Sequence, residues 1–427
     1  MNEIMAIWAE WLRPSAGLPT VQWSILLAVA AAAGYLLQRY TGLPKVVGYS
    51  LVGTLAGLAG FSGAVWPLQG IALFLLELGV AVVLFEAGGR IALRWFRHNP
   101  MVLLQSLLEA VLTYGFVYYL MRWMDVRPAV TEALALIAMA ASPAVLSRVI
   151  MDTRAAGPVT ERAMVLSTLS TLYALTLVSA RAGMMHRPDT GLSETLYPVA
   201  VVLGLSVVVG AVLALALRVA LRVMSPTSEN TSILLITLIA AGTALAAHFG
   251  GSAPLAALLG GMLLKQLNPR PWAWPRQLGT ASSLLVMLMF VLVSVVAAKA
   301  DWNPAVAGLV AVLVVARAAA KILGVGAANW GSGIDWRQAF WTGCAMSPMS
   351  SIALLLVSQF VASSATLGPR IASIALPAIL LMEVLGAIIA TLAIYKAGES
   401  SRPWAPEVLG ANALPPAGEM RGGDYRG

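Results

Sequence analysis

Charge and cysteine are what this sequence has least of. Only 11% of its 427 residues are charged, whereas a soluble domain carries about 25%. So few charges cannot cover a surface in water, which excludes an ordinary soluble protein. The single cysteine, Cys344, excludes an internal disulfide and a metal cluster held by cysteines. Because the few histidines and the lone cysteine also form no nucleophile–base or metal-ligand pattern, we expect neither an enzyme nor a cofactor.

The hydrophobic runs lack the period-two alternation of barrel strands, and the N-terminus lacks the basic start of a cleaved signal peptide. What is present is 59% hydrophobic residues and a mean hydropathy of +0.83. Apolar runs recur along the chain at about the 20 residues that a helix needs to cross a bilayer. Since lipid admits only helices and closed barrels, we predict an all-α polytopic membrane protein.

The runs predict thirteen membrane spans within a transmembrane domain at 1–396. A Pro-, Gly- and charge-rich segment at 397–427 is typical of a disordered, cytoplasmic tail. The predicted spans are 21–39, 44–60, 68–89, 100–121, 129–150, 161–180, 196–217, 230–249, 252–267, 280–298, 304–328, 338–360 and 371–395.

Arginine and lysine are more frequent in one set of the predicted loops, for example at Arg90, Arg94 and Arg97. The positive-inside rule then places the N-terminus outside and the C-terminus in the cytoplasm of a cell inner (plasma) membrane. The net charge of +8 is scattered and forms no patch. We therefore expect lipid, and no nucleic acid, around the protein.

Two predicted spans carry the same interruption. Span five contains Ser142-Pro143 and span twelve contains Ser347-Pro348, each on the C-terminal side of an Ala-Met step. Proline removes a backbone donor and disfavours helix at the preceding residue. The two spans are an odd number apart, so they run in opposite directions. Matching breaks in inverted halves are the best sequence pointer to a transporter's binding site, although ordinary proline kinks are the alternative.

Several short motifs, taken in order, resemble the monovalent cation:proton antiporter superfamily, the sodium/hydrogen-exchanger-like transporters. The resemblance covers roughly residues 20–396. The residues that carry it are Leu43-Pro44, Gly48-Tyr49, Gly53, Glu77-Leu78-Gly79, Leu84-Phe85-Glu86-Ala87-Gly88, Ser142-Pro143-Ala144-Val145, and Ala316-Arg317-Ala318 with Lys321.

The resemblance implies inverted repeats with two broken, crossing helices, an elevator-like mobile core, a homodimer, and exchange of a monovalent cation for protons. The family's carboxylates are missing, however. Ser170 and Thr171 stand where cation exchangers carry an acidic pair, and Ser142 stands where the span-five aspartate is expected. The hydroxyls of Ser167, Thr168, Ser170 and Thr171 could ligate a cation, or bond back to their own helix.

Arg317 and Lys321 lie one helical turn apart within span eleven. A charge at that depth is costly unless it is compensated. Arg317 either binds the solute or compensates the negative ends of the two half-helices. Without a span-six acid these cations would make the cavity positive. That favours a second hypothesis, a carrier of a small anion or neutral solute, while a non-transporting scaffold or sensor is the third.

Three glutamates within spans are candidates to replace the missing acid. Glu77 lies in span three, Glu109 in span four and Glu383 in span thirteen. Burial favours the protonated form of a carboxyl group, which suits a proton carrier. Each could instead be a static partner of a basic residue. Glu77 and Glu383 are the proton carriers that we predict, beside a site formed by Ser142, Pro143, Ser170, Thr171, Arg317, Lys321, Ser347 and Pro348.

Overall fold

The computed structural model describes residues 18–401 apart from 62, 92, 185–191, 226–227, 269–275 and 301. Within these residues every regular element is a helix. Ten segments are long and apolar enough to cross a membrane. The other three predicted spans coincide with shorter helices, namely α3 (Lys45–Leu58), α12 (Ala253–Leu267) and the pair α15 (Trp336–Ala345) and α16 (Ser351–Ser363). The helical membrane fold is confirmed, while the count of thirteen stays a prediction.

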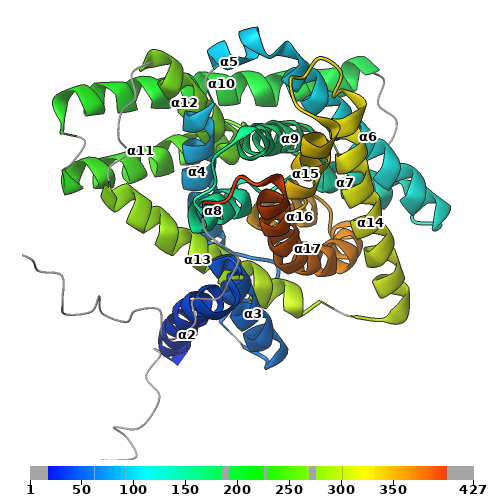
Figure 1. Cartoon of the computed structure of the whole chain (residues 1–427). Coiled ribbons are helices and arrows are strands. Elements are labelled where there is room, and N and C mark those ends of the chain that lie inside the picture. Colours follow the sequence, from blue (N-terminus) through cyan, green and yellow to red (C-terminus); the bar gives the residue numbers. More distant parts are fainter. Residues whose placement is uncertain are drawn as a thin grey trace, which may run out of the picture.

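The helices form two groups, each packed mainly on its own members (Figure 1). In Figure 1, α11 and α12 lie on the left and α6 and α14 on the right. The scaffold group contains α2 (Leu18–Thr41), α3, α4 (Gly70–Arg90), α10 (Leu192–Val223), α11 (Glu229–His248), α12 and α13 (Arg276–Ala298). The core group contains α6 (Pro100–Trp123), α7 (Pro128–Met139), α8 (Pro143–Thr153), α9 (Pro158–Ala182), α14 (Pro304–Ala327), α15, α16 and α17 (Gly368–Ala397). A short helix, α5 (Leu93–His98), links the groups.

Proline sets where several core helices begin. Pro100, Pro128, Pro143, Pro158 and Pro304 each occupy the first turn of a helix. At that position the missing N–H group is not needed for the helix, and the fixed φ angle suits it. The prolines therefore define helix starts and leave the helix interiors intact.

Gly53 and Gly57 bring α3 against α13 within the same chain. A Cβ atom at Gly53 would lie 2.7 Å from the carbonyl oxygen of Val291, and one at Gly57 would lie 2.6 Å from that of Val295. Close backbone approach between two scaffold helices therefore occupies the glycine face.

The chain directly after α17 is ordered where the structure describes it. Gly398 ends the helix in the left-handed region. Glu399 then accepts hydrogen bonds of 2.7 Å from the backbone N–H groups of Val159 and Thr160. These residues, predicted as the start of a disordered tail, instead cap the N-terminus of α9. Residues 402–427 lie outside the described part of the chain.

Candidate functional site

The first break separates α7 from α8. Helix α7 ends at Met139, Ala140 is extended, and Ser142 caps α8 by accepting a hydrogen bond from the Val145 N–H at 3.4 Å. Pro143 occupies the first turn of α8. This is the interruption that the Ser142-Pro143 pair predicted. The carbonyl groups that end α7 consequently lack helical partners.

The second break separates α15 from α16. Helix α15 ends at Ala345, and regular helix resumes only at Ser351. Ser347 and Pro348 lie in the intervening segment and are buried. Both predicted breaks are therefore present, and each leaves unwound backbone inside the protein, which is tolerated only where other groups satisfy it.

Arg317 joins the two breaks. Its Nε–H donates to the Ala138 carbonyl at 3.0 Å, and its Nη2 group donates to the carbonyls of Ala140 at 2.8 Å and Pro348 at 3.2 Å. A fourth bond, of 2.5 Å, runs from Nη1 to the Ser347 carbonyl. The guanidinium group is fully buried. Its charge therefore compensates the negative ends of α7 and α15, the structural role anticipated for it.

Lys321 forms a buried ion pair with Glu109 of α6. Its ammonium group also donates to the Met139 carbonyl at 3.2 Å. Close approach of the two helices makes this pair possible, because a Cβ atom at Gly324 would lie 2.4 Å from the Glu109 Cα. Lys321 is thus paired with an acid, whereas the four partners of Arg317 are uncharged carbonyl groups.

Glu109 of α6 lies beside Ser170 of α9. Its carboxylate accepts hydrogen bonds from Ser170 and, at 3.1 Å, from Thr113. Ser170 is a position where the family resemblance leads one to expect a carboxylate. The carboxylate next to Ser170 therefore comes from α6 and not from α9.

The other α9 hydroxyls divide into two kinds. Thr171 donates to Ala141, at the first break, with an oxygen–oxygen distance of 3.1 Å, and also lies 2.8 Å from the Ser167 carbonyl. Thr168 bonds back to Met164 at 2.7 Å. Thr171 thus contacts the break and also bonds back to its own helix, whereas the Thr168 bond is of the back-bonding kind alone.

The two predicted proton carriers lie in different surroundings. Glu383 of α17 is fully buried and accepts a 3.3 Å hydrogen bond from Ser294. Glu77 of α4 is only partly buried. Neither carboxylate pairs with Arg317 or Lys321, the basic residues that were possible partners for them in the sequence.

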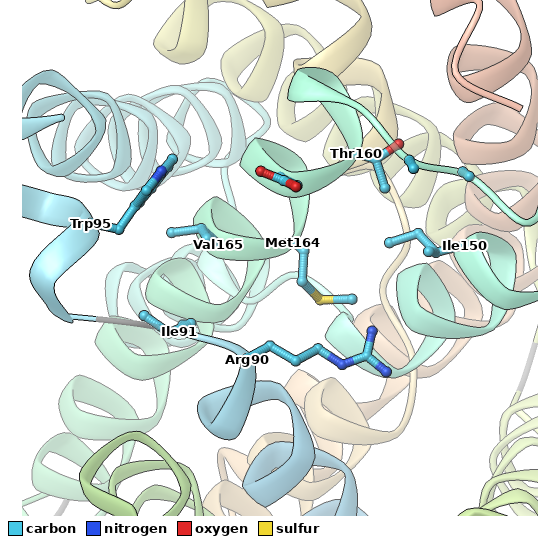
Figure 2. Close-up of a pocket in the computed structure, with 10 residues that line it drawn as sticks. Arg90, Ile91, Trp95, Ile150, Thr160, Met164 and Val165 are labelled. Atoms are coloured by element: carbon cyan, nitrogen blue, oxygen red, sulfur yellow. The ribbon is translucent and has the colours of Figure 1, made fainter. Parts of the chain in front are cut away.

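A cavity of about 410 Å³ lies where α4 and α8 end and α9 begins. Arg90, Ile150, Thr160 and Met164 surround it from these three helices (Figure 2). Met164 accepts the Thr168 hydrogen bond, so the cavity is about one helical turn from the α9 hydroxyls. The cavity thus lies next to α8, the second half of the first broken helix.

Comparisons with known proteins agree with this geometry. A family model described as "Sodium/hydrogen exchanger, transmembrane" matches residues 25–395. The structure is similar to that of the sodium proton antiporter MjNhaP1 from Methanocaldococcus jannaschii at pH 8, with a TM-score of 0.65 and 14% identity over 90% of this chain and 98% of that one. An electron-microscopy structure of MjNhaP1 from the same organism is also similar, with a TM-score of 0.68 and 16% identity over 94% of this chain and 100% of that one. No curated protein sequence matches the chain.

Proposed function

Because the chain belongs to the sodium/hydrogen exchanger family, we propose that it is a secondary active transporter that exchanges a monovalent cation for protons across the cell membrane. The two broken helices that Arg317 joins carry the proposal. Unwound backbone at the centre of a membrane protein lines a solute site in transporters of this construction.

The hydrogen bonds of the cluster, in which Arg317 and Lys321 already have partners, favour a cation over an anion. Arg317 is engaged by four carbonyl groups, and Lys321 by Glu109 and Met139. An anion would have to displace these bonds, because few donors remain. The oxygen atoms of Ser142, Ala141 and Thr171 face the break and suit a hard monovalent cation. The Ser142, Ser170, Thr171, Ser347 and Pro348 positions therefore form the solute-facing wall in this proposal.

The experiment is proton exchange in proteoliposomes. Vesicles containing the purified protein and a pH-sensitive dye are loaded at acid pH, and NaCl, KCl, LiCl or choline chloride is then added across pH 6–9. We expect proton release with at least one alkali cation and none with choline or in empty vesicles. Absence of proton release with every alkali cation would reject the proposal. Equal release with choline chloride would follow the anion and favour the anion carrier. An unaltered cell phenotype after replacement of Ser142, Thr171, Arg317 and Lys321 together would favour a scaffold.

The proposed orientation has the N-terminus outside and the C-terminus in the cytoplasm of the plasma membrane. Two exposed positions lie at opposite ends of the α7–α8 segment and so on opposite sides of the membrane in this proposal. They are Arg127 before α7 and Ala156 before α9. With Cys344 replaced by alanine, we expect an impermeant thiol reagent added to intact cells to label Arg127→Cys and spare Ala156→Cys. The reverse pattern would invert the topology.

A further inference from the structure

A second polar cluster lies apart from Arg317, around Glu383. The Glu383 side chain is 1% exposed, and only one of its oxygen atoms, Oε2, has a hydrogen-bond partner, Ser294 at 3.3 Å. The hydroxyls of Ser50 and Ser350 also interact with this carboxyl group. Within the described residues, however, neither hydroxyl makes a hydrogen bond of regular geometry, and nor does Glu383 Oε1. We name Glu383, Ser50, Ser294 and Ser350 the Glu383 cluster. Each of its members is at most 1% exposed.

The cluster contains one acid and, within the described part of the chain, no base. The groups that interact with Glu383 are the three serines, contributed by α3, α13 and the segment before α16. An uncompensated buried charge costs several kcal/mol. The carboxyl group must therefore hold a proton or bind a cation.

The oxygen atoms determine which cation fits. A carboxylate and three hydroxyls supply oxygen ligands alone, which suit hard cations and not soft ones. One negative charge is balanced by a monovalent ion, whereas a divalent ion would leave a buried positive charge. The unpartnered Glu383 Oε1 and the Ser50 and Ser350 hydroxyls are the free ligand atoms.

The cluster lies on the boundary between the two helix groups. Glu383 and Ser350 belong to the core group, whereas Ser50 and Ser294 belong to the scaffold group, and α17 packs against both α3 and α13. Gly386, one turn after Glu383, packs on Pro348 of the second break. An occupant of the cluster would therefore touch both groups and the break at once.

We propose that the Glu383 cluster is an alkali-cation site in which a proton and a sodium-sized ion compete for the Glu383 carboxylate. Binding of one cation releases one proton, so the charge of the site stays constant. This proposal rests on the antiport function and assigns its exchange step to a residue of α17. Movement of the core group then takes place only with the carboxylate neutralised, because a bare charge would otherwise slide past apolar surface.

Glu109 is the rival residue for this role, and its contacts distinguish it. Both of its carboxylate oxygens are engaged, by Lys321 and Thr113 on one side and Ser170 on the other. A cation or a proton would have to displace Lys321 first. The Glu383 carboxylate requires no such displacement, since one of its oxygens has no partner.

The test is binding of radioactive ²²Na⁺ to the purified full-length protein at several pH values. For the parent protein, we expect the apparent Kd for Na⁺ to fall about tenfold for each unit by which the pH rises, as long as the free site is protonated. This is the behaviour of any ligand that displaces one proton. Glu383→Gln should weaken binding at least about tenfold, and Ser50→Ala or Ser350→Ala several-fold, because each removes a ligand of a buried charge. Glu383→Asp should keep part of the affinity.

Thr391→Ala is the matched control. Thr391 lies two turns along α17, is buried, and bonds only to the Ala387 carbonyl at 2.7 Å, so its loss should leave ²²Na⁺ binding unchanged. Parent-like binding by Glu383→Gln, with antiport intact in the parent, would overturn the site and leave the function standing. Loss of ²²Na⁺ binding in Glu109→Gln alone would place the cation site at Glu109 instead. If the parent neither binds nor exchanges any alkali cation, site and function both fail. Should Glu383→Gln not fold, the serine variants decide.

Discussion

Arg317 spans both helix breaks through one planar group. Its nitrogen atoms donate to two carbonyls of the first break, at Ala138 and Ala140, and to two of the second break, at Ser347 and Pro348. A guanidinium group presents five donors in a fixed fork, whereas an ammonium group presents three on a flexible stem. The geometry therefore requires arginine, and a positive charge alone is insufficient.

Replacing Arg317 with lysine tests this requirement. The ammonium group keeps the charge but cannot reach all four carbonyls, so at least one buried acceptor loses its partner, at a cost of about 1–3 kcal/mol. We expect Arg317→Lys to lower the thermal unfolding midpoint of the purified protein and to reduce cation-driven proton release at least about tenfold. A variant with the stability and transport of the parent would show that charge alone suffices.

The Lys321–Glu109 pair predicts strong coupling between two residues far apart in sequence. Removing one partner of a buried ion pair costs about 3–5 kcal/mol, because it leaves a lone charge, whereas an uncharged replacement of both is often tolerated. We therefore expect Lys321→Met and Glu109→Gln each to destabilise the protein strongly and the double variant to recover most of the loss. Additive single effects in thermal unfolding would contradict the pairing.

Sequence reasoning found the charged residues but could not find their partners. Arg317, Lys321, Glu109 and Glu383 were recognised because an ionisable group in an apolar run is conspicuous. That Glu109 meets Lys321 depends on the packing of α6 against α14, which the sequence signals only through the glycine at 324. Ser50 and Ser294 were not anticipated as neighbours of Glu383, since a single serine in a membrane helix carries no distinguishing signal.

Among the elements, close backbone contacts define how the broken helices are held. A Cβ atom at Gly386 of α17 would lie 2.6 Å from the Pro348 Cα, nearer than atoms of real structures approach. The small residue thus lets α17 support the second break directly. By contrast, a Cβ atom at Gly308 of α14 would meet nothing within 4 Å.

These two glycines form a matched pair of alanine substitutions. Gly386→Ala forces backbone apart in a packed region, for which we expect a loss of about 1–3 kcal/mol together with impaired transport. Gly308→Ala adds helix propensity without a clash and should be neutral or stabilising by up to about 1 kcal/mol. Thermal unfolding of the two purified variants measures the difference. Equal midpoints would mean that α17 does not press against the break.

The positions of the two breaks were predictable, because proline acts locally. The length of the unwound segment at each break was not. Ser142-Pro143 and Ser347-Pro348 located both interruptions. After Pro348, however, helix resumes only at Ser351, although nothing in the local sequence forbids an earlier start. The Arg317 bonds to Ser347 and Pro348 hold this stretch open, and such long-range contacts do not appear in a sequence pattern.

For the whole molecule, the division into two helix groups determines what can move. The core group carries both breaks, Arg317 and the Lys321–Glu109 pair, whereas the scaffold group surrounds one side of it. Contacts across the boundary are fewer than those within each group. Sliding of the core group as one body would carry the broken helices without disrupting their hydrogen bonds, which is the movement expected of an elevator-like transporter.

A cross-link between the groups tests this movement. The Lys45 N–H of α3 donates to Asp152 Oδ2 of α8 at 3.0 Å, so the two residues are neighbours across the boundary. In a Cys344→Ala background, we expect Lys45→Cys with Asp152→Cys, joined through disulfides by a short bifunctional methanethiosulfonate, to stop cation-driven proton release. Reduction should restore it. Each single-cysteine variant treated in the same way controls for the loss of the native contact and should respond little. Full transport by the cross-linked protein would require the two groups to remain fixed at this contact, and the solute path would then have to open by local movements within the core group.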